Sequence, residues 1–188
     1  MTPARAVILA IDPGKRSGWC MRNPPTLPAH IPSAGAGTLP VYSGAATSIE
    51  GREFALSLAM ADAVRFKLPL VVVAESWSRH GKWGHAQQAG TSAEWGKWLA
   101  AIEMVGVDEL PKLGRASMYR GVVRVDSTAW HVALGGSRRN PREVRLRMAM
   151  ARSKCSDPDE ACARCISEWA SLAPEVDAVL PAAFRRAT

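Results

Sequence analysis

The stretch Ala6-Val-Ile-Leu-Ala-Ile-Asp-Pro-Gly14 decides the fold that we expect for this chain. Its continuous apolar run, rich in Val and Ile, predicts a strand that is buried on both faces of a sheet. Asp12 ends that strand, where a carboxylate is costly unless a cation compensates it. The Pro-Gly pair predicts a turn into a return strand over Lys15–Met21. Asp12 is therefore either a functional carboxylate or a cap of the turn.

A second stretch, Leu68-Pro-Leu-Val-Val-Val-Ala-Glu75, repeats this pattern of a β-branched run that ends in an acid. Taken alone, Glu75 could also be a strand-end acid in solvent. Two buried parallel strands that each end in an acid bring their carboxylates together at the carboxyl edge of the sheet, where open α/β sheets bind ligands. The two stretches together therefore predict a site at this edge.

The residues Ile8-Leu-Ala-Ile-Asp-Pro-Gly14, followed by Ser17-Gly-Trp19, resemble the first motif of the RuvC-like Holliday junction resolvases, which belong to the RNase H-like superfamily. The resemblance implies that Asp12 holds a catalytic metal and that Glu75 is the metal-binding Glu of the fourth strand. The pair Asp177-Ala178 resembles the Asp-Ala pair of the closing helix, which supplies the last metal ligand. Bacterial members usually carry another Asp one helical turn earlier, where this chain has Pro174.

Composition favours a polyanionic partner. The chain has 188 residues, enough for a single domain over 1–188, and a formal charge of +7 with a pI near 9.7. No apolar run is long enough to cross a bilayer, and the N-terminus has no signal-peptide pattern. Four cysteines without an export signal indicate a reducing cytoplasm. By resemblance, that cytoplasm is bacterial, and the protein is encoded by the bacterium or by a bacteriophage.

The densest basic run lies between residues 138 and 154, where a helix is predicted to begin at about Asn140. A run with seven basic residues and one acid is better explained by phosphate contacts than by a solvated helix face. The polar loop 76–90 interleaves basic and aromatic residues, so Trp77 could stack on an unpaired base or fold back onto the core. The candidate DNA contacts are Lys15, Arg16, Trp77, Arg79, Lys82, Arg138, Arg139, Arg142 and Arg145.

The remaining segments predict supporting structure. We expect a third strand over Gly35–Ser43, a helix from about Thr47 to Lys67, and an amphipathic helix that buries Trp95 and Trp98. A fifth strand, Gly121–Asp126, ends in an acid that we interpret as a helix or turn cap.

The spacing of Cys155, Cys162 and Cys165 allows a zinc site with His131 as fourth ligand. Free, partly buried thiols are the favoured interpretation, because no second close pair of ligands exists. A last helix is predicted over Pro174–Arg186, with Val176, Val179, Leu180 and Ala183 on its buried side and Asp177 at the edge of that stripe.

The predicted fold class is α/β, an RNase H-like mixed five-stranded sheet flanked by helices. By resemblance, the chain is a Mg²⁺-dependent endodeoxyribonuclease of recombination and repair that accepts Mn²⁺ and uses two ions per site. Its catalytic and metal-binding residues are Asp12, Glu75 and Asp177. A homodimer would nick two symmetric strands of a four-way DNA junction.

Two alternatives remain. One is a structure-selective or non-catalytic nucleic-acid-binding protein of the same fold. The other is an actin-like ATPase, which would need a second phosphate loop and a longer chain.

Overall fold

A computed structural model of the chain describes residues 5–24, 41–76, 92–104, 119–126 and 128–185. Five strands form one sheet in the order β3-β2-β1-β4-β5. Their bounds are β1 (Val7–Asp12), β2 (Ser17–Arg22), β3 (Val41–Ala46), β4 (Leu70–Ser76) and β5 (Tyr119–Asp126). The pairs β1–β2 and β2–β3 are antiparallel, and the pairs β1–β4 and β4–β5 are parallel. The predicted mixed five-stranded sheet is therefore confirmed.

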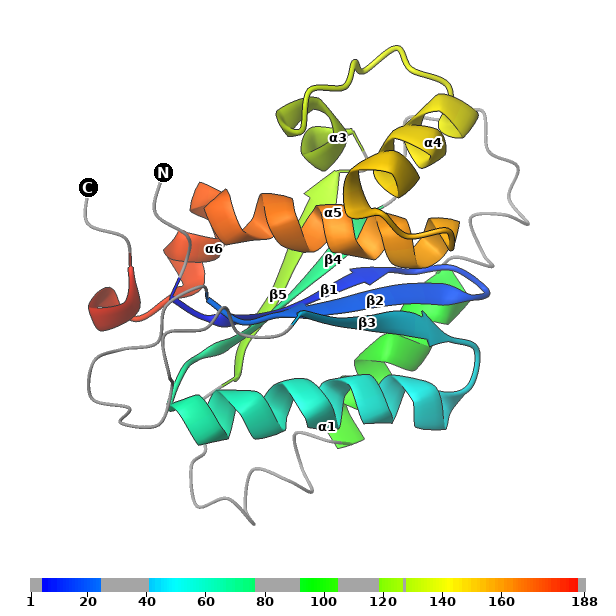
Figure 1. The fold of residues 1–188 in the computed structure, drawn as a ribbon. Coiled ribbons are helices and arrows are strands. Elements are labelled where there is room, and N and C mark those ends of the chain that lie inside the picture. The colour runs from blue at the N-terminus through cyan, green and yellow to red at the C-terminus, as the bar shows by residue number, and fades with distance from the viewer. Residues whose placement is uncertain (1–4, 25–40, 77–91, 105–118, 127, 186–188) are drawn as a thin grey trace.

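Helices cover both faces of this sheet (Figure 1). One face carries α1 (Ile49–Phe66) and a helix over residues 92–104. The other carries α3 (Ala129–Ala133), α4 (Arg142–Ser153), α5 (Pro158–Leu172) and α6 (Pro174–Val179), and a short 3-10 helix, Ala182–Phe184, follows α6. No helix in the described part of the chain is long and apolar enough to span a membrane.

The apolar run of β1 is explained by burial on both sides. Val7 and Leu9 pack in the cluster beneath α1, whereas Ile8 and Ala10 pack in the cluster beneath α5, and all four are at most 1% exposed. Successive side chains of a strand point to opposite faces. Asp12 therefore lies on the face that α5 covers.

Helix α5 begins beside Asp12 and runs toward the start of β1. A Cβ atom on Gly18, the partner of Asp12 in β2, would lie 1.9 Å from the carbonyl oxygen of Asp159, so only glycine admits the first turn of α5 here. Two helical turns later, the Ser167 hydroxyl accepts a hydrogen bond from Arg22, which pairs near the start of β1. The direction of α5 fixes which residues reach the carboxyl edge of the sheet.

The end of the chain differs from the prediction. Helix α6 stops at Val179 instead of continuing to Arg186, because Pro181 has no N–H to donate to the carbonyl of Asp177. The longer α5, which had not been predicted as a separate helix, covers the sheet instead. The third strand begins at Val41, and residues 35–40 of the predicted strand lie outside the described residues.

Candidate metal centre

Asp12 and Glu75 meet at the carboxyl edge of the sheet, as the two strand patterns predict. β1 and β4 are parallel neighbours in which Ile11 pairs with Ala74, so the next residues of both strands are adjacent. Alternation puts Glu75 on the same face as Val73, which packs in the cluster beneath α5. Both carboxylates are half-buried, on the side that α3 and α5 cover.

The electrostatics of this pair are unfavourable for two negative charges. Burial, followed by the charge of Asp159, raises the pKa of Asp12 to about 6. Burial, followed by the charge of Asp12, raises the pKa of Glu75 to about 8. Each carboxylate accepts one hydrogen bond that opposes this rise, from the thiol of Cys162 to Asp12 and from the indole N–H of Trp130 to Glu75. The two acids share a site with too little positive charge to ionise both easily.

Two arginines of α4 supply positive charge that acts on the pair. Arg142 lowers the pKa of Asp12, and Arg145 lowers that of Glu75, although both effects are smaller than the effect of burial. Within the described residues, neither guanidinium forms an ion pair. In that part of the chain, the guanidinium groups of Arg142 and Arg145 therefore have no carboxylate partner.

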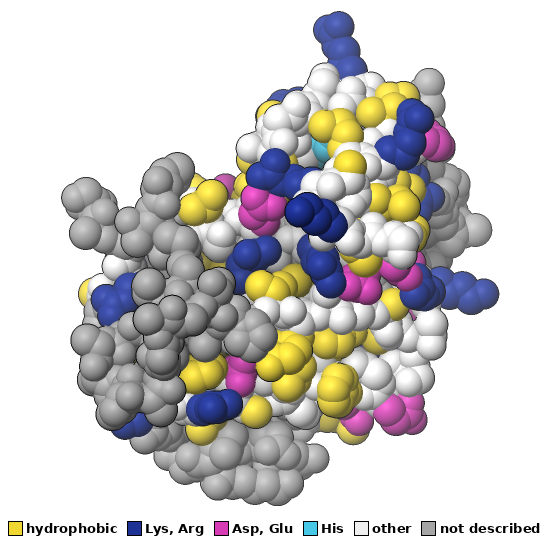
Figure 2. Space-filling view, in the orientation of Figure 1, with side chains coloured by type: hydrophobic (Ala, Val, Ile, Leu, Met, Phe, Trp, Pro, Cys, Tyr) yellow, Lys and Arg dark blue, Asp and Glu magenta, His cyan; other side chains and the backbone are white. Residues whose placement is uncertain are grey.

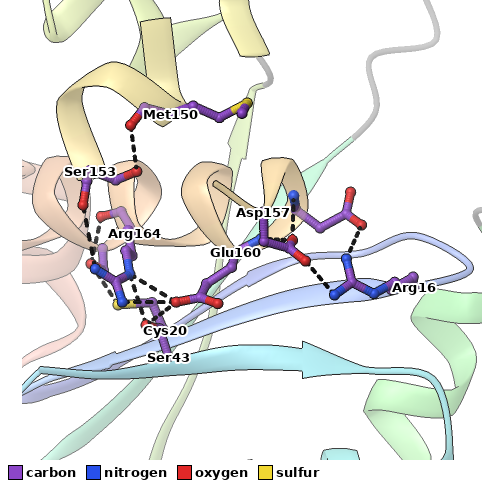
Figure 3. A network of polar contacts seen from close by, with 10 residues as sticks. Arg16, Cys20, Ser43, Met150, Ser153, Asp157, Glu160 and Arg164 are labelled. Carbon is purple, nitrogen blue, oxygen red and sulfur yellow. Dashed lines mark hydrogen bonds and ion pairs between the residues drawn. The ribbon is translucent and has the colours of Figure 1, made fainter. Parts of the chain in front are cut away.

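Two further acids lie near the pair and are already engaged. Asp159 accepts a hydrogen bond of 3.2 Å from Arg16, whose guanidinium also pairs with Asp157 (Figure 3). Asp126 accepts hydrogen bonds from the backbone N–H and the hydroxyl of Thr128 at 2.8 and 2.6 Å. Asp126 is thus the turn cap that the sequence favours.

The Asp12–Glu75 pair fits a magnesium ion. Mg²⁺ takes oxygen ligands, and proteins commonly bind it through one or two carboxylates together with substrate phosphates and water. A divalent cation between the two acids would remove the repulsion that raises the pKa of Glu75. Among the described residues, no group of three His, Cys, Asp or Glu side chains could hold a metal by itself. Water and substrate commonly supply the remaining ligands of such an ion.

Asp177, the third predicted metal ligand, lies on α6 and does not join this pair in the structure. Fifteen residues of α5 separate α6 from the carboxyl edge, a length of about 22 Å at 1.5 Å per residue. Helix α6 packs against the end of α5 and against β5, at the side of the sheet where β1 begins (Figure 1). The prediction had taken Pro174–Arg186 as the closing helix that reaches the site, whereas α6 ends at Val179.

The start of α5 carries the acids that the sequence interpretation missed. Glu160-Ala161, with Asp157 one helical turn earlier, has the spacing that the resemblance implies for a closing helix. Asp157 caps α5 by accepting from two backbone N–H groups of its first turn, and Glu160 accepts from Ser43 and Arg164 at 2.7 and 2.8 Å (Figure 3). A cap followed by a proline in the first turn is a helix-start signal that could have located α5.

The predicted DNA contacts fall into three groups. Lys15, Arg138, Arg139 and Arg142 are exposed and Arg145 is half-buried, and Lys and Arg side chains lie over α4 in Figure 2. Arg16 is engaged with the acids of α5. The other three, Trp77, Arg79 and Lys82, lie outside the described residues.

The four cysteines form no disulfide. Cys162 faces Asp12, whereas the thiol of Cys165 lies 3.8 Å from the carbonyl oxygen of Ala149. His131, the conceivable fourth zinc ligand, is hydrogen-bonded through Nε2 to the amide of Asn140 at 3.1 Å. No zinc group forms among the described residues.

Fold and site together define an α/β protein with a candidate divalent-metal centre at the carboxyl edge of a mixed sheet. No model of a protein family and no curated protein matches the chain. Among solved structures, the chain is similar to Thermus thermophilus RuvC in complex with a Holliday junction substrate. The identity is 17%, over 86% of this chain and 90% of that chain, and the TM-score is 0.45. A second structure of Thermus thermophilus RuvC has 15% identity, over 88% and 96% of the two chains, and a TM-score of 0.43. Because both TM-scores are below 0.5, the case for a function rests on the chain's own residues.

Proposed function

We propose that this protein is a Mg²⁺-dependent endonuclease that cuts four-way DNA junctions, with Asp12 and Glu75 as its metal-binding carboxylates. The observation that carries the proposal is the like-charged pair at the carboxyl edge, where the pKa of both acids is raised and the arginines of α4 stand beside them. When bound, magnesium ions would activate a water and stabilise charge on the leaving oxygen of the phosphodiester.

The chain's own residues would position the DNA strand. Arg142 and Arg145 approach the acids from α4, so a phosphate held between metal and arginine would be neutralised from both sides. The exposed Arg138 and Arg139 precede α4 and extend this basic surface toward a DNA arm. A chain with a charge of +7 also attracts polyanions in general.

The four-way junction is proposed from the motif resemblance. Such a junction has two-fold symmetry, which a homodimer with one active site per subunit matches. The two subunits would then nick two symmetric strands. Trp77, two residues after Glu75, would stack on a base unpaired at the crossover.

The deciding experiment compares Asp12→Asn with Asp177→Asn in Mg²⁺-dependent cleavage of a synthetic four-way junction. Asp12→Asn should abolish cleavage and leave junction binding intact or tighter, because it removes a metal ligand and some repulsion of phosphate. Asp177→Asn should cut at the wild-type rate, because that acid lies at the other end of the sheet. An Asp12→Asn protein that still cuts at the wild-type rate would end the assignment of Asp12 as a metal ligand.

A second candidate function is junction binding without catalysis. The basic residues before and on α4 support it, because they could bind phosphate whether or not the acids hold a metal. The same assay separates the two functions, since a non-catalytic protein would bind the junction with Mg²⁺ present and release no nicked product.

A further inference from the structure

We propose that Trp130 is a positioning residue that orients the Glu75 carboxylate for metal binding. This inference rests on the proposed function, because it takes Glu75 as a metal ligand. It goes further by giving a role to α3, a five-residue helix that no sequence motif had connected with the site.

The contact is direct and partly buried. The indole Nε1–H of Trp130 donates to Oε2 of Glu75 over 2.9 Å, and Trp130 is 4% exposed. The final torsion of a glutamate is broad, so an unrestrained carboxylate rotates between many orientations. A fixed donor on one oxygen removes much of this freedom before any cation arrives.

The donor is itself held in place from both sides. Upstream, Asp126 at the end of β5 fixes the turn into α3 by accepting from Thr128. Downstream, the ring of His131 packs edge-on against Trp130 with centroids 5.8 Å apart, and its Nε2 is hydrogen-bonded to Asn140 just before α4. The indole is therefore anchored to the end of one strand and the start of a helix.

Burial alone does not require this hydrogen bond. The indole nitrogens of Trp95 and Trp98 are also buried, and neither makes a hydrogen bond among the described residues. The fold thus tolerates unsatisfied indoles on the opposite face of the sheet, while Trp130 donates to the carboxylate that the proposed metal needs. Groups that hydrogen-bond to a metal-ligating carboxylate commonly tune metal affinity.

The test measures Mn²⁺ binding to the full chain by titration calorimetry, without DNA and at neutral pH. Trp130→Phe removes the donor and keeps an aromatic ring, and it should weaken Mn²⁺ affinity about ten- to hundredfold. Trp98→Phe is the matched control, and its Mn²⁺ affinity should equal that of the wild type. Thermal melting of each variant confirms folding, and Trp130→Met is a second donor-free variant of adaptable shape if the Phe variant does not fold.

The Glu75→Gln variant separates failure of this inference from failure of the proposed function. If Glu75→Gln binds Mn²⁺ like the wild type, Glu75 is no metal ligand and the proposed metal site falls. If Glu75→Gln loses Mn²⁺ while Trp130→Phe and Trp130→Met bind it normally, the metal site stands and the positioning role is overturned. The inference also requires that Trp130→Phe cause no further loss of affinity in the Glu75→Gln background.

Discussion

Two regions of the molecule bury charged side chains and treat them in opposite ways. On the buried side of α1, the side chain of Arg52 is 1% exposed, and its guanidinium lies 2.6 Å from the carboxylate of Glu94. The same guanidinium lies 5.8 Å from the centroid of the Trp98 ring. On the other face of the sheet, Asp12 and Glu75 bring two like charges together, and no ion pair with either forms among the described residues.

The difference shows which buried charges serve the fold. A buried arginine with a carboxylate partner is compensated within the chain, so its removal should lower stability. A buried pair of acids costs stability and persists only where something outside the chain compensates it, which is why strongly shifted pKa values mark functional sites. Removing a charge should therefore lower stability at Arg52 and raise the stability of the metal-free protein at the acid pair.

The largest effect on stability is expected from Arg52→Ala. Among the described residues, it leaves the half-buried Glu94 with the exposed Lys97 as its one ion-pair partner, at 2.7 Å. We expect a loss of about 3 kcal/mol in urea unfolding, at the low end for a broken buried pair because Lys97 remains. The control, Lys97→Ala, should cost less than about 1 kcal/mol, as surface pairs do. Equal losses in the two variants would mean that Arg52 is not the compensating charge.

The acid pair should destabilise the metal-free protein as pH rises. The folded protein holds protons on Asp12 and Glu75 more tightly than the unfolded chain does, because both pKa values are raised. Stability from this pair is thus fully present below the ordinary pKa values and is lost as pH rises toward 8, the raised pKa of Glu75. Between pH 4.5 and 8, metal-free protein should lose stability, and Glu75→Gln should remove the part of this loss that comes from Glu75.

The effect of Mg²⁺ on stability at pH 8 completes the test of the acid pair. Added Mg²⁺ should restore stability at pH 8 in the wild type and not in Glu75→Gln, with a gain of about 2.7 kcal/mol at a hundredfold excess over its Kd. A metal-free stability that rises over this pH range would contradict the raised pKa values. An equal gain from Mg²⁺ in both proteins would place the ion elsewhere.

The two regions also differ in how far the sequence could predict them. Strands β1 and β4 were predictable because burial on both faces makes each a continuous apolar run, and their terminal acids follow from parallel pairing. The boundaries of α5 were missed because its cysteines suggested a metal motif, although the cap at Asp157 was visible. The hydrogen bond from Trp130 to Glu75 joins residues 55 positions apart through a helix too short to show periodicity, so only tertiary structure reveals it.

A smaller effect is expected at the arginines beside the acids. Arg142→Gln combined with Arg145→Gln should weaken binding to all DNA structures alike and flatten the salt dependence by about 0.9 per lost phosphate contact. Arg152→Gln on the same helix is the control, because its guanidinium already donates to Glu168 at 2.9 Å. If the double variant and the control have the same salt slope, the arginines beside the acids do not bind phosphate.

The smallest effect should come from Cys162, and it tests whether the acid pair is ionised in the folded chain. The Cys162 thiol donates to Asp12, which stabilises the charged carboxylate. The loss from Cys162→Ala should therefore be greater at pH 8 than at pH 4, with a difference of about 1 kcal/mol for one hydrogen bond to a partly compensated charge. Cys165→Ala is the matched control, since the Cys165 thiol is also buried on α5 but faces the carbonyl oxygen of Ala149. Its loss should be the same at both pH values, because the carbonyl does not titrate. A loss at Cys162 that is equally independent of pH would mean that the thiol only fills space, and that Asp12 is held at the edge of the sheet without it.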